Sequence, residues 1–269
     1  MATWVGYFSN ALAELYNTGT SSVTGVADSG ATGTAPYAVD MDLATQWLPG
    51  SSATRDFQIN LGSAMAIDHV AILGHNVSTA VTLYSAATFG ATTTSQVSFT
   101  PTSGVDTGGT VGTAGVGVSS RYWTLRITSP TASTYIGEIF LGLVSGRVDF
   151  STAGPYMPLG RALSPGFATV QSANGSIQTQ VTGGPSRVLD LPFRGASLAS
   201  GQPWNTMESL YYSTNGYRKG VLLLDENFSS PARVYWGIPQ GGLPSVNDMA
   251  GGRVSGSLRL LLPPYGLSV

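Results

Sequence analysis

The sequence predicts an all-β protein, and three observations carry that prediction. Of its 269 residues, 10% are Asp, Glu, Lys or Arg, and 35 are Gly. Ser and Thr are abundant throughout, a composition that suits strands and tight turns better than exposed helices, which usually carry Glu and Lys. Short segments with alternating apolar and polar residues recur along the chain, bounded by Gly, Asn, Ser or Pro.

The first half contains six such segments, short and separated by turns as in a β-sandwich or barrel. They are FQINL at 57–61, HVAILG at 69–74, AVTLYS at 80–85, SQVSFTP at 95–101, RYWTLRIT at 121–128 and EIFLGLV at 138–144. The segment at 104–120 is rich in Gly, Ser and Thr, which predicts a long mobile loop that folding does not need. A short helix or a turn is predicted at 9–16, where Ser9 or Asn10 could cap it.

The composition of the sequence changes near Gly146, where prolines become closely spaced. We predict a domain boundary there, with a β-sandwich over 1–145 and a second β-rich domain over 146–269. The second domain has one helical segment, WNTMESLYYSTN, near 204–215. Its predicted strands are SIQTQVTG, SRVLDLPFRG, KGVLLLDEN, ARVYWGIP and GSLRLLLPP.

Composition excludes several classes of function. The formal net charge is −2 and Lys219 is the single lysine, so no basic patch can neutralise phosphates and we expect no nucleic-acid partner. The chain has no Cys, which removes disulfides, thiolate metal sites and a cysteine nucleophile. No run of about 18 apolar residues occurs, and the N-terminal segment lacks a cationic signal region. We therefore expect neither membrane insertion nor a secretory signal.

The two histidines do not predict catalysis. His69 and His75 are six residues apart in a strand-and-turn context, which suits neither one helical face nor neighbouring metal ligands. No G-x-S-x-G motif supplies a nucleophile for a triad. No paired acid and base can be assigned elsewhere, so we expect no enzyme activity and give the histidines packing or turn-stabilising roles.

Five blocks of the first half occur in an order that is similar to a known family. They are AVDMDLATQW at 38–47, FQINLG at 57–62, IDHVAILGHN at 67–76, RYWTLRIT at 121–128 and IGEIFLG at 136–142. Their order and spacing resemble a discoidin domain of the coagulation factor 5/8 C-type and its related carbohydrate-binding modules. The match covers about the first 145 residues, and it implies a jelly-roll β-sandwich in which Trp47 is a core residue.

The resemblance also implies a structural calcium ion between the first loop and the last strand. The matching positions are Asp40, Asp42, Thr45 and Glu138. Two carboxylates, a hydroxyl and nearby carbonyls are ligands that a hard cation prefers. Met41 replaces the family's glycine, which weakens the site if that position needs a positive φ. The alternative is that Asp40 and Thr45 hydrogen-bond their own turn.

The second half resembles the C-terminal portion of phage and prophage minor tail or baseplate proteins. The blocks that carry this are RVLDLPFRG, MESLYYSTNGYRKGVLLLDEN and ARVYWGIPQGG. In the first half, a strand that ends in Gly-His-Asn at 74–76 resembles discoidin-like domains of tailed-phage virion proteins. The two resemblances imply a structural component of a tail tip or baseplate, assembled in the host cytoplasm, located in the virion and able to contact host glycans. A free carbohydrate-binding or adhesion module is the alternative.

A particle subunit of this kind is expected to form a ring with copies of itself and to bind other tail proteins. Few charges leave little repulsion between copies, and many strands leave edges that partners must cover. We predict the main assembly surface in the second half, because aromatic residues dominate interface cores. Its aromatic candidates are Trp204, Tyr211, Tyr212, Tyr235 and Trp236.

Overall fold

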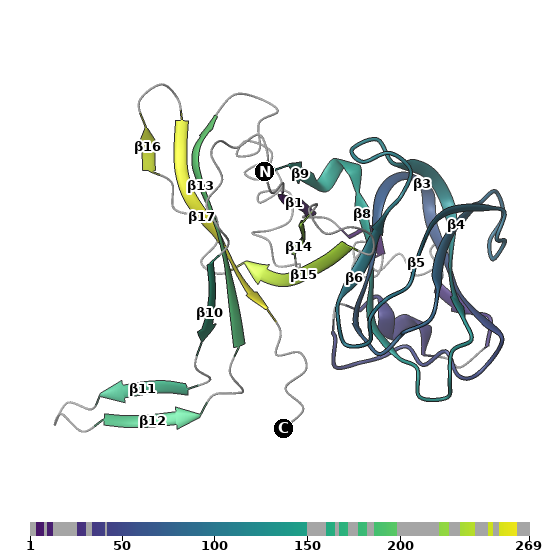
Figure 1. The fold of residues 1–269 in the computed structure, drawn as a ribbon, viewed down its shortest axis with the longest axis horizontal. Helices are drawn as coiled ribbons and strands as arrows, with labels where there is room; N and C mark the ends of the chain where they lie inside the picture. The colour runs from purple at the N-terminus through teal and green to yellow at the C-terminus, as the bar shows by residue number, and fades with distance from the viewer. Residues whose placement is uncertain are drawn as a thin grey trace. The chain divides into compact units, whose positions relative to one another are not determined.

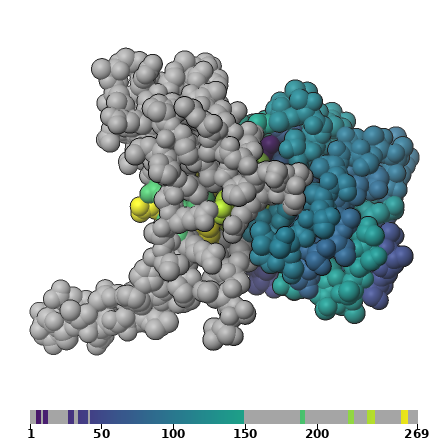
Figure 2. Space-filling view, in the orientation of Figure 1, coloured from purple at the N-terminus to yellow at the C-terminus, as the bar shows by residue number. Residues whose placement is uncertain are grey.

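The chain divides into two compact units in the computed structural model. Unit 1 contains Met1–Phe150 and Leu222–Tyr235, and unit 2 contains Ser151–Val221 and Trp236–Val269. The structure describes residues 4–7, 10–12, 26–30, 34–40 and 42–149, together with the strands β10 to β17 beyond them. In the space-filling view, the described residues of unit 1 form a continuous body (Figure 2).

Unit 1 is a β-sandwich with two short 3-10 helices (Figure 1). Its elements are β1 Trp4–Tyr7, β2 Val26–Asp28, η1 Ala35–Ala38, β3 Thr54–His75, β4 Val81–Ala86, β5 Thr94–Phe99, β6 Thr107–Thr110, β7 Val118–Thr128, β8 Ile136–Leu143, η2 Val144–Gly146 and β9 Arg147–Asp149. They are joined by β14 Val221–Asp225 and the first part of β15 Ala232–Pro239, which come from the far end of the chain.

Strand β3 belongs to both layers of the sandwich. Its first part pairs with β7, from Thr54↔Thr128 to Asn60↔Tyr122, and with β2 on its other edge. After a register shift between Asn60 and Met65, its second part pairs with β8 and β6. The first layer continues from β7 to β4 and then to β5. One strand of 22 residues therefore ties the two layers together.

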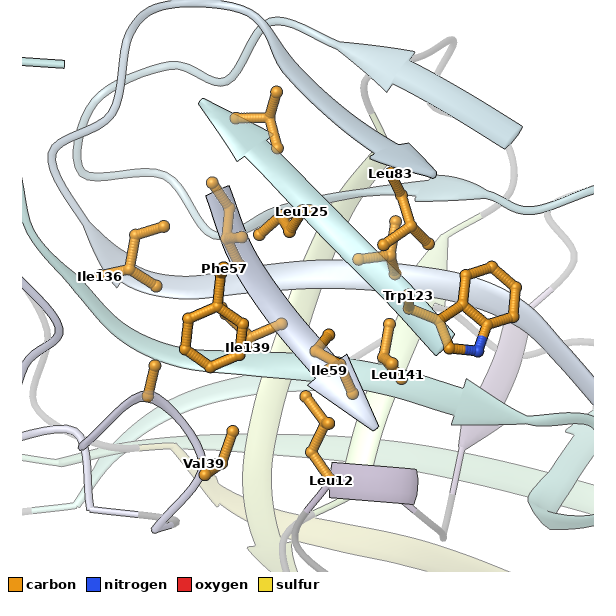
Figure 3. Close-up of a cluster of buried hydrophobic side chains, with 14 of the residues drawn as sticks. Leu12, Val39, Phe57, Ile59, Leu83, Trp123, Leu125, Ile136, Ile139 and Leu141 are labelled. Carbon is orange, nitrogen blue, oxygen red and sulfur yellow. The ribbon is translucent and has the colours of Figure 1, made fainter. Parts of the chain in front are cut away.

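Apolar side chains from both layers fill the space between them (Figure 3). In the first part of β3 and in β4 they alternate with more exposed residues, as a half-buried strand requires, whereas every residue of β8 is buried. The fully buried members include Trp47, Phe57, Ile59, Leu83, Trp123, Leu125, Ile127, Ile136, Ile139 and Leu141. Burying a side chain of this size contributes roughly 1.5–3 kcal/mol, so this layer is the main source of stability in unit 1.

The predicted all-β fold is confirmed. Each strand segment predicted from alternation coincides with a strand, and the segments at 57–61 and 69–74 lie within the single strand β3. The predicted helix near 204–215 lies outside the described residues. Of the helix or turn predicted at 9–16, Asn10 to Leu12 are described, and the Asn10 side chain accepts hydrogen bonds from the Leu12 and Leu141 N–H groups, both at 3.1 Å.

The prediction of a long loop at 104–120 is wrong. Residues 107–110 form β6, which pairs with β3 on one edge and with β15 on the other. A Cβ atom at Gly108 would lie 2.4 Å from Nε2 of His69, so the glycine allows β6 to cross a buried histidine closely. The alternation rule misses this strand because glycines have no side chain to reveal which face is buried.

The C-terminal half of the chain returns to complete unit 1. Strand β1 pairs with β9 on one edge and with β14 on the other, where Gly6 is opposite Leu223. The four residues Val221–Leu224 are buried, with Leu223 fully so. The predicted domain boundary at 146 lies near the point where the chain first leaves unit 1 for unit 2. The sequence did not predict that residues 222–235 belong to unit 1.

Unit 2 is built from antiparallel strands. Strand β13 pairs with β10 and β17, β17 also pairs with β16 and the end of β15, and β11 pairs with β12. The bounds are β10 Gly160–Ser164, β11 Phe167–Gln171, β12 Ile177–Val181, β13 Ser186–Ser197, β16 Asn247–Met249 and β17 Arg253–Leu262. Asp190 and Arg259 are directly opposite in the β13–β17 ladder and form an ion pair of 3.3 Å.

The return segment predicts a specific sensitivity to mutation. Leu223→Ala should lower the free energy of unfolding by about 2–5 kcal/mol, because it leaves a cavity at a fully buried position. Leu48→Ala, at a position that is 44% exposed, is the control and should change it little. Urea denaturation of the full chain measures both. Equal stability of the two variants would show that β14 adds nothing to the packing of unit 1.

Candidate functional site

The acidic loop at 38–47 forms a self-contained turn. The Asp40 carboxylate accepts hydrogen bonds from the Asp42 N–H at 2.9 Å and from the Thr45 hydroxyl at 2.7 Å. The Asp42 carboxylate accepts a hydrogen bond from the Ala44 N–H at 2.9 Å. Asp and Thr side chains commonly stabilise turns in this way. The geometry matches the turn role that the sequence leaves open for Asp40 and Thr45.

The fourth predicted calcium ligand, Glu138, is buried in β8, opposite Leu73 of β3. Within the described residues, no three Asp, Glu or His side chains gather into a group that could hold a metal ion. Both oxygens of Asp40 are already used by its own turn. The calcium site that the resemblance implies stays a prediction, and Met41, at the family's glycine position, lies outside the described residues.

A melting experiment decides between a calcium site and a turn. If calcium binds the folded chain, it raises the melting temperature by mass action. The resemblance predicts a higher melting temperature in calcium than in chelator, and it predicts that Glu138→Gln abolishes the difference. Identical melting curves in calcium and in chelator would assign Asp40, Asp42 and Thr45 to the turn alone.

Trp47 is a core residue, as predicted. Its side chain is fully buried, and its ring meets Phe57 edge to face with the ring centres 4.9 Å apart. Its indole N–H donates to the Asp28 carboxylate at 3.2 Å, which satisfies the one polar atom of the ring. The residue therefore stabilises the sandwich and is closed to a ligand.

His75 links the end of β3 to two neighbouring segments by hydrogen bonds. Its Nε2 lies 3.0 Å from the Val105 carbonyl oxygen, and its Nδ1 accepts a hydrogen bond from the Val77 N–H at 3.1 Å. Nε2–H therefore donates, and the neutral ring satisfies both bonds. Burial is the largest cause that lowers the pKa of His75 to about 4, against the opposing effect of its hydrogen bond to Val105. The ring has a structural role at the Gly-His-Asn turn.

His69 is buried in β3 beside a buried ion pair. Its ring stacks on Tyr7 with centres 5.6 Å apart, and burial together with the charge of Arg147 lowers its pKa to about 3. The Arg147 guanidinium lies 2.9 Å from the Asp68 carboxylate, which also accepts the Gly115 N–H at 2.8 Å. This cluster joins β3, the turn before β7, and β9, so it holds unit 1 together.

The neutral histidines predict an acid sensitivity. Both are neutral when folded, while the unfolded chain takes up protons below about pH 6.5, so stability is complete above that pH and is lost as the pH falls toward 4. At pH 5, each histidine should lower the free energy of unfolding by roughly 2 kcal/mol. His75→Gln should therefore show a smaller loss of stability between pH 7.5 and pH 5 than the unsubstituted chain, measured by urea denaturation. Equal losses would contradict the buried neutral state.

The predicted assembly aromatics fall into two groups. Trp204, Tyr211 and Tyr212 lie outside the described residues. Tyr235 and Trp236 are 8% and 7% exposed, in a run of β15 that is buried from Val234 to Gly237. The structure therefore places these two in the interior, because a strand covered on both faces hides consecutive side chains. Their part in assembly stays a prediction.

The outer face of the first layer carries an aromatic site that the sequence analysis missed. Phe89, in the turn between β4 and β5, is 44% exposed, and its ring meets the half-buried Tyr122 of β7 edge to face at 6.3 Å between centres. The Arg121 guanidinium lies over the same Tyr122 ring, 4.9 Å from its centre. We call these three residues and Asn60 the Phe89 patch.

The turn that carries Phe89 is held against the sheet. The Thr124 hydroxyl of β7 donates to the Ala91 carbonyl at 3.1 Å. Gly90 has φ +76°, and a Cβ atom there would lie 2.9 Å from the Gln58 side-chain amide of β3. Only a glycine takes this conformation at low cost, so it brings the turn close to the sheet and sets Phe89 beside Tyr122.

Arg121 and Arg126, both on β7, differ in their partners. Arg126 forms a two-pronged ion pair with Asp56, with N–O distances of 2.7 and 2.8 Å, and this bond raises its pKa. Arg121 donates from Nε to the Asn60 side-chain oxygen at 3.0 Å. In the described part of the chain, Arg121 forms no ion pair, and its two terminal nitrogens make no hydrogen bond. The charge of Arg126 is balanced by Asp56, whereas no described acidic side chain pairs with Arg121.

A sequence signal for the patch exists but is weak. Phe89 follows a predicted strand in a segment of small residues, AATFGATTT, where an apolar ring has no alternation partner. A lone large apolar residue beside Gly in a turn is typical of an exposed binding residue and equally of chance. Its meeting with Tyr122 depends on the pairing of β4 with β7, which a single sequence does not reveal.

Comparison with known proteins returns structural neighbours but no sequence family. No family model matches, and no curated protein matches the chain. The solved structures with similar folds include a module named CpGH89CBM32-6 produced by Clostridium perfringens, with 15% identity over 50% of this chain and 99% of that chain, at a TM-score of 0.39. Two further neighbours are carbohydrate-binding modules in complex with sugars.

Chitosan-binding module 2 of a chitosanase/glucanase from Paenibacillus sp. IK-5, in complex with chitotriose, is 21% identical over 45% of this chain and 96% of that one, at a TM-score of 0.37. The family 32 module from C. perfringens NanJ, in complex with galactose, is 19% identical over 45% and 93%, at a TM-score of 0.36. Within the described residues, no helix is long and apolar enough to cross a membrane.

Proposed function

We propose that unit 1 binds glycans through the Phe89 patch, within a protein that is a structural component of a phage tail tip or baseplate. The observation that carries the binding role is the exposed Phe89 ring, fixed beside Tyr122 and a charged arginine. A ligand site combines apolar rings with a few placed polar groups, and this patch has both. The apolar face of a sugar can cover the Phe89 ring while its hydroxyls meet the polar groups at the rim.

Rigidity favours binding at this place. Phe89 is positioned by the Gly90 turn and by the bond between Thr124 and Ala91, so little side-chain entropy remains to be lost when a ligand arrives. Buried aromatic residues such as Trp47 and Trp123 cannot serve, because they fill the core. The proposed role is binding, with no chemical step assigned to the patch.

The virion role is supported by sequence resemblance and by composition. The blocks of the second half resemble minor tail or baseplate proteins, and a surface with few charges suits dense packing among copies. The partners we propose are copies of the chain in a ring, other tail proteins and a host glycan. A free carbohydrate-binding module is the second candidate, and the Phe89 patch supports it equally.

A glycan array probed with the full chain tests the binding role. The strongest hit should lose about tenfold or more in affinity on Phe89→Ala, a change of roughly 1.4 kcal/mol. Val116→Ala is the matched control, because Val116 is 68% exposed in the turn before β7 and has no part in the patch. Absence of any glycan hit, or equal binding by the two variants, would refute the proposal for this surface.

The virion role needs a separate measurement on the full chain. A fragment ending at 145 would lack β14 and the start of β15, which complete unit 1, so truncation is a poor test. Light scattering and electron microscopy of the full chain should show rings, or the chain should co-purify with tail proteins. A monomer that binds a glycan and no tail protein would favour the free module.

A further inference from the structure

We infer that the Phe89 patch selects sugars that carry a carboxylate, with Arg121 as the residue that recognises the acid. This inference rests on the proposed glycan-binding function and names its substrate class. It starts from a difference between two arginines on one strand. Arg126 is occupied by Asp56, while Arg121 presents a charged guanidinium that no described acidic side chain pairs.

The Arg121 side chain is oriented before any ligand arrives. Its Nε–H donates to Asn60 at 3.0 Å, and its guanidinium carbon lies 4.9 Å from the Tyr122 ring centre. Two contacts on one side of the group leave the two terminal nitrogens for a partner from solvent. Guanidinium presents these donors in a fixed fork, which matches the two oxygens of a carboxylate.

Phe89 and Arg121 can act on one ligand because both contact the same ring. Each lies next to Tyr122, with the Phe89 ring centre 6.3 Å and the Arg121 guanidinium carbon 4.9 Å from the Tyr122 ring centre. A glycan that covers the Phe89 ring and extends along Tyr122 therefore meets the Arg121 guanidinium. A carboxylate on that glycan gains a charge-assisted hydrogen-bonded pair, which a neutral sugar lacks.

The surrounding surface strengthens this preference. Only 10% of the residues of the chain are charged, so few neighbouring groups screen or compete with Arg121. On the same face, the acidic Asp56 is neutralised by Arg126 and does not repel an anion. Charge complementarity at the patch therefore favours an acidic sugar over a neutral one.

Three matched probes test the inference by ligand-observed NMR titration of the full chain. They are methyl β-D-glucuronide, its methyl ester, and methyl β-D-glucoside 6-sulfate. The first two share the same ring, and the ester replaces the charged carboxylate with a neutral methyl ester. We expect the carboxylate to bind about tenfold more tightly than the ester, and the preference should weaken as salt rises.

Variants assign the preference to Arg121. Arg121→Gln should remove it and leave weak binding of both probes through Phe89, and Arg121→Lys should keep part of it because the charge remains without the fork. The double variant Asp56→Asn/Arg126→Gln is the matched control and should leave the preference unchanged, since it removes the two paired charges together. Melting curves of each variant confirm that the chain is folded.

The outcomes separate the two proposals. Equal affinity for the acid and the ester overturns the carboxylate inference and leaves the glycan-binding function standing. Tighter binding of the sulfate than of the glucuronide also overturns it, in favour of a sulfated ligand. Binding of none of the probes, together with an empty glycan array, overturns both. A preference that survives Arg121→Gln would place the acid site elsewhere.

Discussion

Strand β3 is the constraint on which unit 1 depends. Its backbone pairs with β2 and β7 in one layer and with β6 and β8 in the other, so its 22 residues set the register of both. A slip by one residue on either side would turn the buried side chains outward, because side chains alternate along a strand. The pairing of β3 with β7 shifts register between Asn60 and Met65 and then continues to Ile67, where the pairing with β8 begins.

The polar interior of unit 1 follows from the same arrangement. His69, Asp68 and His75 lie on or beside the second part of β3, where strands and turns converge. Asp68 pairs with the Arg147 guanidinium, His75 hydrogen-bonds the Val105 carbonyl, and the His69 ring stacks on Tyr7. Buried polar groups that are paired in this way fix one packing arrangement, since the alternatives leave them without partners.

Charge is used sparingly on the outer face, and this makes the Phe89 patch distinct. Asp56 and Arg126 neutralise each other across β3 and β7. Arg121 lies five residues before Arg126 in the sequence, beside the register shift, and contacts Asn60 and Tyr122 instead of an acid. The register shift in the β3–β7 pairing lies next to the contact of Arg121 with Tyr122. The proposed binding patch therefore lies beside an irregularity of the β3–β7 pairing.

The sequence by itself determined the all-β class and the positions of the strands with alternating residues, because alternation reports locally which face of a strand is covered. The burial of Trp47 came from the resemblance of its segment to the discoidin family. The sequence did not reveal β6, whose glycines carry no pattern, or the return of β14 to pair with β1. The meeting of Phe89 with Tyr122 and Arg121 is likewise a tertiary result, since it joins a turn to a strand more than 30 residues away. Such contacts depend on which strands pair, and pairing is decided by the free energy of the whole sandwich rather than by any local segment.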